Sequence, residues 1–203
     1  MQHEAKIHTT KPKDFPPEIQ VAACYVEIDR QVLFLQYSPN KPEPGKWGVP
    51  AGKVKKEETP EEAAKRELFE ETGISAQTSQ IKPRGPIYIL KPHVAYTFHL
   101  FERTARRNLG PSGPSQASYS TICGKELTTH YRSGESSSFQ EEVLQIRLAQ
   151  KPRVQISNEH SDYIWASEQD LATLPLMEGA LAALQHYRIS VAQGKMYSQE
   201  GLI

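Results

Sequence analysis

Runs of apolar and β-branched residues, separated by short polar stretches, fill much of the first half of the chain. Two of them, 19–28 and 31–37, are separated by only two residues, a spacing that predicts a β-hairpin. Two more strands are expected over 81–90 and 93–101. In the second of these, apolar residues recur at every other position, which is typical of a strand with one buried face.

Between the two strand pairs the pattern changes to that of a helix. Signals for both of its ends are present: Thr59 as a cap, Pro60 at the first position, Glu62 three residues after the cap, and Gly73 after the last turn. We therefore predict a helix over 60–72, with its apolar residues on the sheet and its glutamates facing outward. Before it, Trp47 to Ala51 is expected to form one short strand that ends at Val49-Pro50.

In the second half the composition changes to Ser, Gly, Thr and Pro between about 103 and 138, which predicts a polar insertion. A strand is expected around 163–165, then a short helix capped by Ser167 and a longer amphipathic helix packed into the core, marked by apolar residues from Met177 to Val191. The predicted organisation is a flexible arm over 1–17, a single domain over 18–193 containing the insertion, and a tail over 194–203.

Composition restricts the class of protein. The 203 residues carry 24 basic and 24 acidic side chains, so strong nonspecific binding to nucleic acid or to an anionic membrane is not expected. The polar N-terminus lacks the apolar core of a signal peptide, and no later segment is long enough to span a bilayer. Cys24 and Cys123 lack metal-ligand spacing. These features predict a cytoplasmic protein.

Three glutamates in the predicted helix, Glu67, Glu70 and Glu71, share one face. Their Cβ atoms would lie roughly 5–6 Å apart, where like charges repel. A hard divalent cation would compensate, because Mg²⁺ takes oxygen ligands at about 2.1 Å and is commonly shared between carboxylates and substrate phosphates.

The wider spacing around these acids is a recognisable motif. Gly52 is followed after five residues by Glu58, then after seven by Arg66-Glu67-Leu68, then by Glu70-Glu71 and Gly73-Ile74. This is the pattern of the Nudix box, and the chain resembles a Nudix hydrolase. The preceding residues, 47–51, also resemble the family's approach to the box.

The resemblance implies an α/β protein with the Nudix fold, a mixed β-sheet sandwiched between α-helices. It also implies hydrolysis of the pyrophosphate linkage in a nucleoside diphosphate joined to another moiety, with Mg²⁺ as cofactor and Mn²⁺ as a possible substitute. Nucleoside triphosphates or dinucleoside polyphosphates are the first expectation. Nucleotide sugars, ADP-ribose, the 5′ end of RNA, and a non-catalytic nucleotide sensor remain open. The expected partner is a small nucleotide, and the protein is expected to be a monomer or homodimer.

The resemblance also implies roles for residues in the box. Glu67, Glu70 and Glu71 would bind the metal, with the Gly52 carbonyl as a further ligand. Glu67 is the first choice for the base that deprotonates water, with Glu58 as the alternative, and Arg66 would hold a glutamate through a bidentate pair. Candidate substrate-binding residues are Trp47, Lys53, His93 and His99.

One more metal ligand is expected from outside the box. The segment EHSDYIW, which begins at Glu159, resembles the corresponding part of diadenosine tetraphosphate hydrolases, where an extra metal-binding glutamate enters the site. Glu141 and Glu142 compete for this role. The chain departs from that branch at Pro50-Ala51-Gly52, where the branch usually has Pro-Lys-Gly.

Overall fold

A computed structural model describes residues 5–16, 19–104, 151–194, 197–198 and 201–202. These belong to the unit formed by Met1–Thr104 and Lys151–Ile203. The predicted insertion, apart from its first two residues, lies outside the described residues, as do Glu141 and Glu142.

In the described part of the chain most strands come before residue 104, and two of the helices come after β8. The strands are β1 (Lys6–His8), β2 (Ile19–Ile28), β3 (Gln31–Tyr37), β4 (Trp47–Gly48), β5 (Ala51–Lys53), β6 (Ile81–Lys91), β7 (Val94–Arg103), β8 (His160–Ala166), β9 (Tyr197–Ser198) and β10 (Gly201–Leu202). The helices are α1 (Pro60–Thr72), α3 (Glu168–Leu171) and α4 (Ala180–Ala192), with a 3-10 turn η1 (Thr78–Gln80). None of these helices is both long and apolar enough to cross a membrane.

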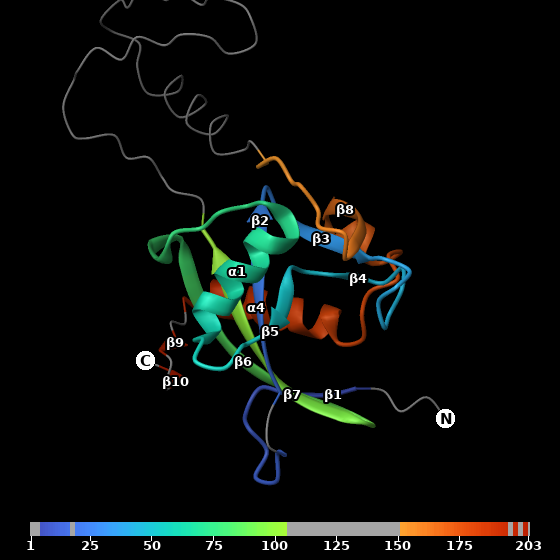
Figure 1. Cartoon of the computed structure of the whole chain (residues 1–203). Helices are drawn as coiled ribbons and strands as arrows, with labels where there is room; N and C mark the ends of the chain where they lie inside the picture. The colour runs from blue at the N-terminus through green and yellow to red at the C-terminus, as the bar shows by residue number, and fades with distance from the viewer. Residues whose placement is uncertain (1–4, 17–18, 105–150, 195–196, 199–200, 203) are drawn as a thin grey trace, which may run out of the picture. The chain divides into compact units, whose positions relative to one another are not determined.

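Strand β2 is the centre of the main sheet (Figure 1). The strand order is β1-β6-β7-β2-β3-β4, with β5 beside β2 and β8 beside β3. Strands β2 and β7 run parallel, whereas the other pairs in this sheet are antiparallel. The mixed sheet that the Nudix resemblance implied is therefore confirmed.

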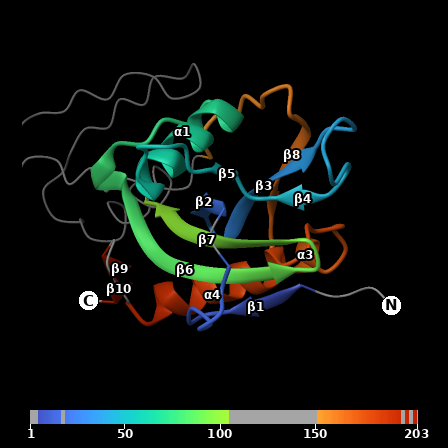
Figure 2. The same ribbon diagram turned by 60° about the horizontal axis from the view of Figure 1, so that its bottom comes forward.

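Helices α1 and α4 cover opposite sides of the strands (Figure 2). Alternation along β2 and β3 supplies a core to each side, because successive side chains of a strand point to opposite faces. Cys24 and Leu33 pack in the core that includes α1, whereas Tyr25 and Phe34 pack in the core that includes α4. Tyr25 stacks there on Tyr187 of α4, with ring centroids 4.3 Å apart.

The predicted hairpin and box helix form as expected. Asp29 and Arg30 join β2 to β3 and both adopt positive φ, 51° and 62°, as in the mirror-image turns that suit the twist of a hairpin. Helix α1 has the predicted bounds. Thr59 and Glu62 form a complete capping box, and Gly73 ends the helix with φ 69°.

The segment before the box differs from its prediction. Instead of one strand over Trp47–Ala51 there are two, β4 on β3 and β5 on β2. They are divided at Val49-Pro50 because proline has no N–H for a ladder; the Pro50 carbonyl still accepts the Cys24 N–H at 2.9 Å. Gly52 therefore lies in strand β5.

Two other expectations need correction. The predicted N-terminal arm contains β1, which pairs with β6 through Lys6↔Leu90. The predicted core stripe of the last helix is only partly buried: Leu184 is 1 % exposed, but Leu181 is 49 % exposed and Val191 37 %. The short capped helix forms at Ser167 as predicted.

Candidate functional site

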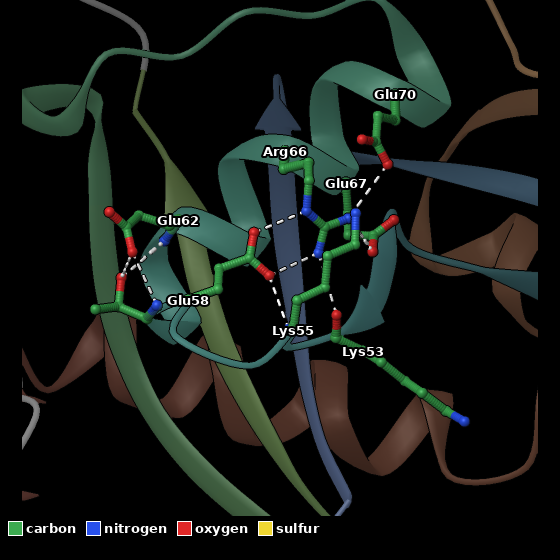
Figure 3. A network of polar contacts seen from close by, with 8 residues as sticks. Lys53, Lys55, Glu58, Glu62, Arg66, Glu67 and Glu70 are labelled. Atoms are coloured by element: carbon green, nitrogen blue, oxygen red, sulfur yellow. Dashed lines mark hydrogen bonds and ion pairs between the residues drawn. The ribbon is translucent and has the colours of Figure 1, made fainter.

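Arg66 on α1 holds three of the predicted site glutamates at once (Figure 3). Its Nε and Nη2 donate to the two carboxylate oxygens of Glu58 at 2.7 and 2.8 Å. Its Nη1 donates to Glu67 Oε1 at 2.5 Å and to Glu70 Oε2 at 3.2 Å, and Nη2 also donates to the Lys53 carbonyl at 3.1 Å. The planar guanidinium, which offers several donors in a fixed fork, thus relieves the repulsion among these acids.

Glu58 reaches Arg66 from the loop that precedes α1. Its Oε2 also accepts the Lys55 N–H at 2.9 Å. Hydrogen bonding from Arg66 is the main reason that the pKa of Glu58 falls to about 2. A carboxylate that is so firmly charged and bonded is a poor acceptor for the proton of a water molecule, and it is better suited to anchoring the loop.

Gly52 lies directly against the carboxylate of Glu67. A Cβ built at this position would come within 2.0 Å of Glu67 Oε1 and 2.1 Å of its Cδ. The φ of Gly52 is not positive, so the close approach, rather than a special backbone conformation, requires glycine here. The missing side chain allows the Glu67 carboxylate to rest on the β5 backbone.

Glu71 is buried, at 5 % exposure, and the prediction that the glutamate face points outward is wrong for this residue. Two long-range contacts cover it: the Ala51 N–H donates to its Oε2 at 3.0 Å, and the Ser157 N–H donates to its backbone carbonyl at 3.2 Å. Burial raises the pKa of Glu71 to about 8, with the negative charges of Glu67 and Glu159 acting in the same direction. A cation next to this carboxylate would favour its charged form.

His160 on β8 faces Glu71, although sequence analysis did not select it. The histidine is 5 % exposed, and its Nε2 lies 3.8 Å from Glu71 Oε1. Burial lowers the pKa of His160 to about 4, so the imidazole is neutral at neutral pH. The available signal was its place directly after Glu159, within the EHSDYIW segment.

Glu159 lies at the edge of this site, where β8 begins. Its side chain is 50 % exposed and pairs with Lys41 Nζ at 2.7 Å, while its backbone carbonyl accepts the Ser38 N–H at 3.0 Å. Because its charge contributes to the raised pKa of Glu71, it lies within electrostatic range of the box helix. Its role as a metal ligand remains a prediction.

The four candidate substrate-binding residues do not gather at one place. Trp47 is 7 % exposed in the α4 core, so its ring is not available at the surface. The side chain of Lys53 extends away from the Arg66 network (Figure 3). His99 pairs in register with Ala22, which belongs to the α1 core, so it lies on the opposite face of the sheet from Trp47. His93 is exposed and lies in the turn between β6 and β7.

The chemistry of the donor set fits a divalent cation. Glu67, Glu70, Glu71 and the Gly52 carbonyl would supply only oxygen atoms, which Mg²⁺ and Mn²⁺ prefer. Within the described ranges, no three His, Cys, Asp or Glu side chains are already gathered as a metal cluster. Instead, the Arg66 guanidinium provides the positive charge for Glu67 and Glu70 in this structure.

The mixed sheet between α1 and α4, and the acidic helix joined to the preceding loop by its own arginine, are the features that the Nudix resemblance implies. Residues 17–114 match the NUDIX domain family model. This match agrees with the resemblance that the box indicated.

Known relatives agree with this assignment. The chain is similar to the phosphatase NudJ of Escherichia coli strain K12, with 46 % identity over 65 residues, which cover 31 % of this chain and 39 % of NudJ. The match thus spans about two fifths of the length of this curated relative.

Two solved structures show the same fold. A NUDIX hydrolase from Nitrosomonas europaea has a TM-score of 0.56 at 16 % identity, covering 91 % of this chain and 95 % of that one. The other is a bifunctional NMN adenylyltransferase/ADP ribose pyrophosphatase from Francisella tularensis, complexed with AMP and a Mn ion. Its TM-score is 0.55 at 17 % identity, covering 89 % of this chain and 43 % of that one.

Proposed function

We propose that this protein is a divalent-metal-dependent hydrolase that cleaves the pyrophosphate linkage of a nucleoside diphosphate joined to another moiety. The observation that carries this proposal is the arrangement of the box: Glu67 lies against Gly52, and Arg66 holds Glu58, Glu67 and Glu70 together. A solvated acidic face would not require such close packing. The Francisella relative, with its AMP and Mn ion, supports the nucleotide and metal classes.

In this proposal Glu67, Glu70 and Glu71 hold the cation, with the Gly52 carbonyl as a further ligand. When bound, Mg²⁺ or Mn²⁺ screens the polyphosphate from the carboxylates, stabilises charge on the leaving oxygen and acidifies a water. Glu159 would add a ligand from the other side of the site.

The protein's own groups then have distinct tasks. Glu67 would accept the proton of the attacking water, since Glu58 is engaged at both oxygens by Arg66. Arg66 would keep Glu67 and the loop in register. Because Glu67 rests on Gly52, its carboxylate has little freedom to swing away, and such fixed positioning lowers the entropic cost of reaction.

The substrate class is proposed as a nucleoside triphosphate or a dinucleoside polyphosphate. The EHSDYIW segment, whose residues after Glu159 form most of β8, favours the second. Nucleotide sugars, ADP-ribose and the 5′ end of RNA are the alternatives among hydrolases, and a non-catalytic nucleotide sensor is the alternative outside them.

Chromatography of the products from a small panel tests these alternatives directly. The panel contains a nucleoside triphosphate, diadenosine tetraphosphate, ADP-ribose, a nucleotide sugar and a 5′-triphosphorylated RNA, each incubated with Mg²⁺. We expect a nucleoside mono- or diphosphate to appear from one or both of the first two. Binding of a nucleotide without product from any member of the panel would favour the sensor.

A further inference from the structure

An irregularity in β8 places His160 on the same side of the sheet as α1. The β3–β8 register runs regularly to Gln36↔Asp162 and then shifts to Tyr37↔His160, leaving Ser161 as an extra residue. In an uninterrupted register His160 would share the face of Asp162 and Ile164, because side chains alternate along a strand. A bulge of this type redirects a side chain and is frequent next to active sites.

The imidazole ring of His160 is buried and contacts Tyr37 and Ser157. It lies 5.2 Å from the ring of Tyr37, measured between centroids, and its Nδ1 is 3.3 Å from Ser157 Oγ. Ser157 Oγ also accepts the Glu159 N–H at 3.4 Å. When the serine O–H donates to Nδ1, the ring N–H lies on Nε2, the atom that faces Glu71.

His160 faces Oε1 of Glu71, the carboxylate oxygen that does not accept the Ala51 N–H. Glu71 Oε2 accepts the Ala51 N–H at 3.0 Å, whereas Oε1 faces His160 Nε2 at 3.8 Å. Ser157 connects the two residues a second time, because its N–H donates to the Glu71 carbonyl at 3.2 Å. The end of α1 and the start of β8 are therefore tied together around a single carboxylate.

We infer that Ser157 donates to Nδ1 of His160, so that the Nε2–H faces Glu71 at 3.8 Å, and that His160 is thereby a positioning residue that restrains the Oε1 side of this buried carboxylate, so that an incoming divalent cation meets an oriented ligand. This inference rests on the proposed function, in which Glu71 binds the metal. Carboxylates that bind metals are commonly held by hydrogen bonds from neighbouring groups, and losing such a partner typically costs 10–100-fold in metal affinity. His160 would touch neither the cation nor the substrate.

The test is a titration of the full chain with Mn²⁺ alone, in which the signal of free Mn²⁺ is followed by electron paramagnetic resonance. Three variants separate the two nitrogens of the ring. His160→Gln keeps an N–H close to the Nε2 position, His160→Asn keeps only a group near Nδ1, and His160→Leu keeps neither. His8→Leu on β1 is the matched control, and thermal unfolding of each variant shows whether it folds.

We expect His160→Leu and His160→Asn to bind Mn²⁺ at least tenfold more weakly than the wild type, and His160→Gln to return to within about threefold of it. Wild-type affinity in His160→Asn or His160→Leu, or no recovery in His160→Gln, would overturn the inference while the proposed function stands. Absence of Mn²⁺ binding by the wild type would instead overturn the proposed function and the inference with it.

If the leucine and asparagine variants do not fold, Ser157→Ala decides the matter. This variant retains the imidazole and removes the partner that fixes its proton on Nε2. We expect Mn²⁺ affinity to fall several-fold, as for loss of a supporting hydrogen bond. An unchanged affinity would overturn the proposal.

Discussion

The acidic residues of the box are held in two opposite ways. Glu58, Glu67 and Glu70 converge on Arg66, with donor–acceptor distances between 2.5 and 3.2 Å. Among the described residues, Glu71 on α1 forms no ion pair with an arginine or lysine; it is 5 % exposed and accepts a backbone N–H. The first group is held by a fixed positive charge, whereas burial raises the pKa of Glu71.

This difference separates two requirements of a metal site. Arginine pairing keeps carboxylates ionised and in place before any cation arrives, at the cost of competing with it. Burial disfavours the negative charge of a carboxylate, and a cation that binds beside it reverses this preference. A site that contains both types is organised in advance and still retains a driving force for binding metal.

The largest expected effect comes from the Arg66 side of this comparison. In Glu67→Gln the amide oxygen can still accept from Arg66, but the group can no longer take a proton. We expect kcat to fall by about 10²–10⁴, the usual range for loss of a general base, as measured by steady-state kinetics. Glu61→Gln on the same helix, where Glu61 pairs with Lys65, is the control. If Glu58→Gln were crippled while Glu67→Gln remained active, the base would have to be Glu58.

The next prediction distinguishes a glycine required by close packing, Gly52, from one that adopts a positive φ, Gly45. Gly52→Ala would push the Glu67 carboxylate out of place, and kcat/KM should fall by about 10–100-fold in a folded protein. Gly45→Ala is the contrast: Gly45 has φ 75° and no atom within 4 Å of the added Cβ. It should lose about 1 kcal/mol of stability and no activity, as judged by urea denaturation and kinetics. Full activity in Gly52→Ala would contradict the packing argument.

A smaller effect is expected at the edge of the site. Glu159→Gln should lower kcat, or raise the Mg²⁺ concentration needed for half-maximal rate, by at least about tenfold. Glu141→Gln and Glu142→Gln should do less. Wild-type behaviour of Glu159→Gln together with a crippled Glu141 or Glu142 variant would place the additional carboxylate elsewhere.

The smallest effects should appear as opposite dependences of stability on pH in metal-free protein. The pKa of Glu71 is raised from 4.5 to about 8, so the folded state retains a proton that the unfolded state has lost. The contribution of Glu71 to the free energy of unfolding should therefore decline as pH rises from about 4.5 to 8. The pKa of Glu58 is lowered to about 2, so its contribution is present above pH 4.5 and is lost as pH falls towards 2.

Urea denaturation at several pH values in excess chelator measures both slopes. Subtracting the Glu71→Gln curve from that of the wild type should isolate the decline between pH 4.5 and 8, and Glu58→Gln should remove part of the loss in acid. Identical curves for Glu71→Gln and the wild type would show that burial does not suppress the charge of Glu71.

Local signals explain what could be predicted from the sequence. The bounds of α1 follow from its cap, its first proline and Gly73, all within the helix or next to it. The burial of Glu71 could not be predicted in this way, because Ala51 and Ser157, the residues that cover it, are distant in the sequence. His160 was missed for the same reason: its orientation depends on a bulge that exists only once β8 pairs with β3.

The division of the segment before the box shows the limit of a local rule. Pro50 indicated correctly that a strand must end, but the sequence did not reveal that Ala51–Lys53 would begin another on β2. That second strand brings Gly52 against Glu67 and the Ala51 N–H against Glu71. The candidate site therefore depends on tertiary pairing as much as on the motif.

The central claim is that the box glutamates hold a catalytic divalent cation. The most direct test measures turnover of the best substrate from the nucleotide panel with Mg²⁺ and with excess chelator, for the wild type, Glu70→Gln and Glu71→Gln. We expect activity to require the metal and to be largely lost in both variants, while each still unfolds cooperatively. Turnover undiminished in chelator, or in both variants, would contradict the assignment of this site.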